Sequence, residues 1–146
     1  MRGGRNQRQL GFTLVELLVV LVIIGLAAAA VVLAIPDPEG SLQTEAERFA
    51  ARTKAARDLA IVESRPALLR IEPDGYSVSR RSDGAWQEAD RYNWAEGTEV
   101  EAAGAEGTQS RFDSTGLAQP LQVTLRRRDR QVAIAIGEDG SVRVQR

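Results

Sequence analysis

The stretch Gly11-Phe12-Thr13-Leu14-Val15-Glu16 decides how this chain is organised, because it places one carboxylate at the head of a long apolar segment. The apolar run that follows, residues 17–35, is about 19 residues long and as a helix would span roughly 28 Å, close to a bilayer core. A lone acid on such a helix is costly in lipid. Glu16 is therefore predicted to be functional and to pair with a cation.

The segment before this stretch is short, polar and basic, with arginines at positions 2, 5 and 8. One interpretation is a secretory signal peptide with its apolar region at residues 17–26 and a cleavage site at the alanines that follow. Two observations argue against a signal peptide: Glu16 directly precedes the apolar region, and the apolar run continues past the alanines. A plain single-span anchor, with its basic flank inside, leaves Gly11 and Glu16 unexplained.

Composition limits the function classes open to this chain of 146 residues with a formal net charge of −1. Losing the three N-terminal arginines would take the net charge to about −4, which makes a poor general nucleic-acid binder. The chain has no cysteine and no histidine, so thiol chemistry, the usual general base and the commonest metal ligand are missing. We expect no enzyme activity, no metal and no cofactor.

Downstream of the apolar run, the prolines of Ile35-Pro36-Asp37-Pro38 interrupt the helix. Ser41 is a predicted helix cap, and Glu45 falls in the first turn, where the helix dipole favours an acid. Residues 42–64 carry a helical apolar pattern. The members of that pattern are Leu42, Ala46, Phe49, Thr53, Ala56, Ala60 and Ile61.

After Pro66 the apolar period changes to two, which is typical of strands. Residues 67–72 and 76–80 predict a hairpin about Pro73-Asp74-Gly75, and residues 85–88 continue it after a second turn. Residues 89–97 show no period and are predicted to form a loop. Further strands are predicted at residues 98–102, 108–112, 121–127, 131–136 and 141–144. The predicted fold class is α+β, a long N-terminal helix packed on six to eight antiparallel strands.

A short basic leader, a glycine and an apolar helix with one early glutamate resemble the processing site of type IV pilins and type II secretion pseudopilins. The resemblance implies that a membrane aspartate peptidase cuts between Gly11 and Phe12 and methylates the new N-terminus. It also implies that Glu16 pairs with the terminal amine of a neighbouring subunit during filament assembly. The implied organisation is a leader at 1–11, a transmembrane and filament-core helix at 12–35 and a periplasmic domain at 36–146.

The later part of the chain is similar to the minor pseudopilins of type H and to related minor pilins of type IV pili. The segments that carry this similarity are Ala56 to Ile61, Ser64 to Leu68, Gly75-Tyr76, Gly84-Ala85-Trp86, Phe112 to Ala118 and Gly140-Ser141-Val142. Within them, Tyr76 and Trp86 are expected to pack on the sheet, and Asp113 and Gly116 to form a turn. Glu138 and Asp139 are too few for the calcium site that the resemblance gives to major subunits.

The resemblance implies a structural subunit of a secretion pseudopilus, anchored once in the bacterial inner membrane. Its implied partners are the prepilin peptidase, other major and minor pseudopilins and an inner-membrane assembly platform. The alternative is a minor type IV pilin for pilus assembly or DNA uptake, motivated by an arginine-rich hairpin. Its candidate phosphate contacts are Arg126, Arg127, Arg128 and Arg130. Against it, Asp129 dilutes the charge and strand alternation splits the arginines between two faces.

Overall fold

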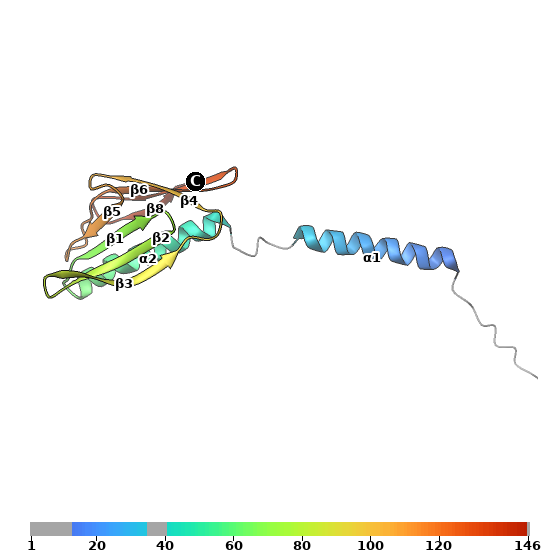
Figure 1. Cartoon of the computed structure of the whole chain (residues 1–146), viewed down its shortest axis with the longest axis horizontal. Helices are drawn as coiled ribbons and strands as arrows, with labels where there is room; N and C mark the ends of the chain where they lie inside the picture. Colours follow the sequence, from blue (N-terminus) through green and yellow to red (C-terminus); the bar gives the residue numbers. More distant parts are fainter. Residues whose placement is uncertain (1–12, 35–40, 146) are drawn as a thin grey trace, which may run out of the picture. The chain divides into compact units, whose positions relative to one another are not determined.

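The computed structural model describes residues 13–34 and 41–145, and the chain divides into two compact units at residues 38 and 39. The first unit holds helix α1 (Leu14–Ala34), and the second holds helix α2 (Leu42–Val62) and all the strands. Figure 1 shows both units. Gly11, Phe12 and the Pro36 region lie outside the described residues.

Helix α1 begins at a side-chain cap that the sequence analysis did not include. The Thr13 hydroxyl accepts the backbone N–H of Glu16 at 3.3 Å, and the Thr13 carbonyl accepts the same N–H at 3.0 Å. Threonine followed three residues later by glutamate is the spacing of a capping box. The large apolar side chains from Leu14 to Leu26 are exposed. Within the described residues, no helix is both long and apolar enough to cross a membrane.

Helix α2 has the cap and the apolar face that the sequence predicts. The Ser41 hydroxyl accepts the N–H of Thr44 at 3.1 Å. The helix ends two residues earlier than predicted, because Ser64 takes a left-handed conformation with φ of 52° and Pro66 follows. Its buried side chains are Leu42, Ala46, Phe49, Thr53 and Ala60. Ile61, which the pattern also placed on this face, is 38% exposed instead.

In the described part of the chain, eight strands form two four-stranded antiparallel sheets, which confirms the predicted α+β fold with six to eight strands. The first sheet has the order β3-β2-β1-β5, from β1 (Ala67–Glu72), β2 (Gly75–Ser82), β3 (Ala85–Asn93) and β5 (Gln109–Phe112). The second has the order β4-β6-β7-β8, from β4 (Glu99–Gly104), β6 (Leu121–Arg127), β7 (Arg130–Ile136) and β8 (Val142–Gln145). The predicted strands coincide with these within one or two residues, except at β3.

The loop predicted at residues 89–97 is wrong over its first half, because β3 continues to Asn93 and pairs with β2 along its length. Strand β3 lies at the edge of its sheet and is largely exposed on both faces, so its sequence carries no apolar alternation. The register also shifts between Val78 and Ser79. Such a bulge moves β3 side chains to the other face midway, which hides the period of two.

The core lies between α2 and the two sheets, and α2 packs against β1 of one sheet and β6 to β8 of the other. Its largest fully buried apolar side chains are Phe49, Phe112, Leu69, Leu125, Ile134 and Val123. The Phe49 ring meets the Tyr76 ring edge to face, with centroids 4.9 Å apart. Tyr76 is therefore a packing residue, as predicted, while Trp86 is only half-buried and lies near the Arg81 guanidinium.

Candidate functional site

The processing motif is described by the structure only from Thr13 onward, so the predicted cut between Gly11 and Phe12 falls outside the described residues. Glu16 stands in the first turn of α1 and is exposed. Its backbone N–H is capped by Thr13, and within residues 13–34 and 41–145 its carboxylate makes no ion pair or hydrogen bond. A helix N-terminus favours an acid electrostatically. Among the described residues, the Glu16 carboxylate therefore has no counter-charge.

The four arginines proposed for nucleic-acid contact do not form one patch. They lie at the hairpin of β6 and β7, and Arg126, Arg128 and Arg130 are exposed. The Arg127 side chain is only 9% exposed and forms an ion pair with Glu45 of α2. Strand alternation sends Arg126 and Arg127 to opposite faces. Three arginines therefore stay accessible and the fourth belongs to the interior.

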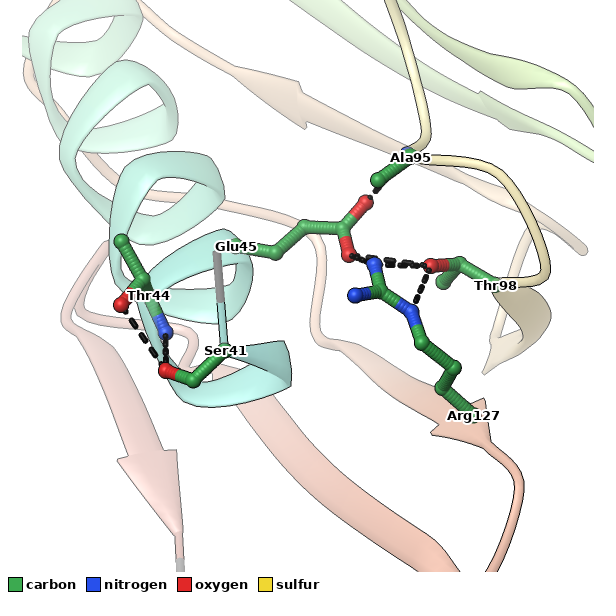
Figure 2. Close-up of polar contacts among 6 residues, drawn as sticks. All are labelled: Ser41, Thr44, Glu45, Ala95, Thr98 and Arg127. Carbon is green, nitrogen blue, oxygen red and sulfur yellow. Dashed lines mark hydrogen bonds and ion pairs between the residues drawn. The ribbon is translucent and has the colours of Figure 1, made fainter. Parts of the chain in front are cut away.

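Glu45 is the centre of a polar cluster in the second unit (Figure 2). One carboxylate oxygen accepts the backbone N–H of Ala95 at 2.7 Å. The other accepts the hydroxyl of Thr98 at 2.9 Å and a guanidinium N–H of Arg127. The cluster thereby joins the first turn of α2, the loop between β3 and β4, and the end of β6.

Thr98 completes this cluster by using every hydrogen-bonding position of its hydroxyl. It donates to Glu45 and accepts from Arg127 Nε at 3.1 Å and from Nη2 at 2.7 Å. A hydroxyl has one donor and two acceptor positions, so none is left over. Burying two charges is favourable only when such extra bonds satisfy them, so the cluster is built to hold these three segments in one geometry.

Sequence reasoning placed Glu45 correctly in the first helical turn but assigned its charge to the helix dipole alone. The residue 82 positions away that neutralises it, Arg127, was assigned to a solvent-exposed hairpin. No local spacing signals a pair so distant. The only sequence signal that Arg127 is not solvent-exposed is its position in β6. It lies two residues after the buried Leu125 and therefore on the face of the strand that points into the core.

A second arginine holds two loops at the other end of α2. Arg57 Nε donates to the carbonyl of Gly116 at 3.0 Å, and Nη2 donates to the carbonyl of Asp139 at 3.4 Å. The loops approach so closely that a Cβ on Gly140 would lie 2.0 Å from the Gly116 oxygen, and Gly140 has a φ of 73°. Only glycine satisfies both conditions.

The turn that begins at Asp113 is confirmed. Its carboxylate accepts the Thr115 hydroxyl at 2.7 Å, the Thr115 N–H at 2.8 Å and the Leu117 N–H at 3.0 Å. These bonds, that from the Thr115 hydroxyl foremost, lower the pKa of Asp113. In the described ranges, no group of three or more acidic side chains is placed to hold a metal ion. The hydrogen bonds of Glu45 and Arg57 connect segments of the second unit that are distant in sequence.

These features define a class: a capped apolar helix with an early glutamate, and a second helix packed on two antiparallel sheets, make a pilin-like protein. Residues 6–32 match the family model of the prokaryotic N-terminal methylation motif. Residues 45–140 match the model of the type II transport protein GspH. The chain belongs to the GspH family.

Two curated relatives agree with that assignment. Type II secretion system protein H of Aeromonas hydrophila is 38% identical over 87 residues, which are 57% of this chain and 48% of the relative. The protein of the same name from Pseudomonas aeruginosa is 40% identical over 72 residues, or 48% and 42% of the two chains. The chain thus spans about half the length of the curated relatives it matches.

Solved structures show the same fold. The minor pseudopilin EpsH from the type 2 secretion system of Vibrio cholerae has a TM-score of 0.62 at 19% identity, over 70% of this chain and 94% of that one. The type IV minor pilin FimU of Pseudomonas aeruginosa has a TM-score of 0.60 at 13% identity, over 72% and 88%. Because both identities are low, these likenesses establish the pilin-like fold alone.

Proposed function

We propose that this chain is a minor pseudopilin, a structural subunit of the type II secretion pseudopilus that helps to start the filament. The observation that carries the proposal is the pairing, on one chain, of the methylation motif at residues 6–32 and the GspH domain at residues 45–140. In this proposal the peptidase cuts between Gly11 and Phe12, and Phe12 becomes the methylated terminus. The chain is then anchored in the inner membrane with its second unit in the periplasm.

The exposed surface of α1 supports assembly through helix packing. An apolar surface all round a helix requires lipid or other helices to cover it. In a low-dielectric surrounding, the free carboxylate of Glu16 needs a positive partner, and a protonated N-terminal amine supplies one. The partners in this proposal are the prepilin peptidase, the other major and minor pseudopilins and the inner-membrane assembly platform.

The proposal is tested by replacing Glu16 in cells and measuring secretion and association with the other pseudopilins. Glu16→Gln preserves the capping-box spacing, because glutamine also serves at that position, but removes the charge. We expect Glu16→Gln and Glu16→Ala to lose association to a similar degree. Normal assembly of Glu16→Ala would refute the assembly role of Glu16. Normal assembly of Glu16→Gln alone would reduce that role to helix capping.

A minor type IV pilin that contacts DNA is the second candidate, and the exposed Arg126, Arg128 and Arg130 are the observation in its favour. Its weakness is that Arg127 is bound to Glu45 and that acids outnumber bases in the chain. A gel-shift titration at low and moderate salt tests it, with the triple Arg→Gln variant of the exposed three as control. We expect no shift at micromolar protein, and a salt-sensitive shift that the control abolishes would favour this candidate.

A further inference from the structure

One face of α2 is only partly covered by the neighbouring strands. Two hollows lie along it, of about 210 Å³ and 220 Å³, and Arg52 lines both. We call them together the α2 groove. The helix residues that line it recur every three or four positions, which puts them on one face. They are Glu45, Arg48, Arg52, Ala55, Ala56, Leu59 and Ala60, followed by Glu63 at the C-cap of the helix.

The groove combines an apolar floor with one fixed cation. Ala56, Leu59 and Tyr92 are half-buried along its floor, leaving apolar surface for a partner side chain. The Arg52 guanidinium lies 3.9 Å from the centre of the Tyr92 ring and donates to the Tyr76 hydroxyl at 3.1 Å. These contacts hold Arg52 in place over the floor, so little of its rotamer freedom remains to be lost on binding.

The acids around the groove already face arginines, whereas two of the arginines that line it form no ion pair among the described residues. Glu63 and Asp90 both face Arg80, with N–O distances of 3.7 Å and 3.9 Å. Glu45 is neutralised by Arg127. The groove-lining side chains of Arg48 and Arg65 are exposed and form no hydrogen bond or ion pair in the part of the chain that the structure describes.

The spacing of the arginines adds to this excess of positive charge. Arg48 and Arg52 are one helical turn apart, and like charges at that spacing destabilise a helix. An acidic ligand would remove the repulsion and bind both guanidinium groups, which match carboxylates in geometry. The unpaired charge on this face therefore selects for carboxylates, while the alanine and leucine floor selects for apolar side chains beside them.

We propose that the α2 groove is a docking site for an acidic segment of another pilin-like subunit, an inference that rests on the proposed function. Carboxylates of that segment meet Arg48, Arg52 and Arg65, and an apolar side chain between them packs on Ala56 and Leu59. The apolar floor favours a protein segment over a nucleic acid, whose phosphates need no such surface. A second copy of this chain is a separate possibility that the experiment below distinguishes.

The test is photo-cross-linking of the full chain in cells that carry its secretion genes, with a benzoyl-phenylalanine at Ala55 or, separately, at Leu18 of α1. We expect Ala55 to cross-link to an acidic segment of another prepilin-type subunit, read by mass spectrometry. The double variant Arg48→Glu and Arg65→Glu is expected to lower the yield of that adduct about tenfold, since two exposed charges are reversed. Lys54→Glu, on the same helix but outside the groove, is the matched control.

Each outcome decides the groove assignment, the proposed function or both. An Ala55 adduct to a second copy or to nucleic acid overturns the groove assignment, as does an adduct that the arginine reversals leave unchanged. Adducts from Leu18 without any from Ala55 overturn the groove and leave the proposed function standing. No prepilin-type adduct from either position overturns both. Thermal unfolding of each variant, with its midpoint compared to wild type, separates lost docking from lost folding. Changing an acid in the cross-linked segment to arginine should restore the adduct of the reversed variant.

Discussion

Glu45 and Arg127 form an ion pair across 82 positions of sequence, with side chains only 14% and 9% exposed. The pair joins the start of α2 to the end of β6 and, through Thr98, to the loop after β3. Both charges are nearly removed from water, so each depends on the other for compensation. The second unit is therefore sensitive to any change that leaves one of them alone.

Replacing Glu45 by alanine should lower the free energy of unfolding by about 3 kcal/mol, because Arg127 would remain buried without a counter-charge. Replacing it by glutamine should cost less, roughly 2 kcal/mol, since the side-chain oxygen can still accept from Ala95. Urea denaturation of the variants measures both values. The control is Glu47→Ala, because Glu47 lies two residues after Glu45 in the same helix and is exposed.

A double-mutant cycle isolates the pair from its surroundings. Arg127→Met removes the buried cation and keeps an apolar stem of similar length. The two single changes should each lower the free energy of unfolding. We expect the double variant, Glu45→Gln with Arg127→Met, to lose less of this free energy than the two single losses added together, by at least about 1 kcal/mol. Strict additivity would show that the two charges do not depend on each other.

Thr53 carries a buried hydroxyl with no hydrogen-bond partner among the described residues, and its side chain is fully buried in α2. Thr53→Val keeps the shape and removes the unpaired polar atom. It should raise the free energy of unfolding by about 1 kcal/mol. Thr53→Ser, which keeps the hydroxyl and deletes the methyl group, should lower it instead. Equal stability of the valine and wild-type proteins would show that the hydroxyl is satisfied.

Arg128 occupies the left-handed region with a φ of 53° at the turn between β6 and β7. A residue with a Cβ is disfavoured there, so Arg128→Gly should stabilise the second unit by roughly 0.5 kcal/mol or more. Arg126→Gly, within the regular part of β6, should destabilise it by a similar amount. Thermal unfolding of the two variants provides the comparison, and a shift of the same sign for both would contradict this reading of the turn.

The Asp113 turn should weaken in acid. The hydrogen bonds from Thr115 and Leu117 hold the pKa of Asp113 below its ordinary value in the folded state. A lowered folded pKa means that the stabilisation is complete above the unfolded pKa and is lost as pH falls through the folded one. The stability difference between wild type and Asp113→Ala should therefore shrink below about pH 4. A difference that is constant down to pH 2 would show that the charge of Asp113 is not involved.

Local chemistry made much of the fold predictable. Ser41 capped α2 as expected, and Asp83-Gly84 formed the tight turn, both with positive φ, that the dipeptide favours in hairpins. The second half of strand β3, residues 89–93, was missed because an exposed edge strand with a bulge carries no apolar alternation. Glu45 and Arg127 could not be paired from sequence, because their meeting depends on how the helix, a loop and a hairpin pack together.

The proposed function requires processing of the chain at Gly11. The N-terminal peptide of the protein purified from the membrane fraction of its own cells tests this most directly. Mass spectrometry should find a peptide that begins at Phe12 and carries one methyl group on its amine. In cells that lack the prepilin peptidase the same peptide should begin upstream of Gly11. An N-terminus after the alanines at residues 28–30, or an uncut leader in cells with active peptidase, would contradict the account.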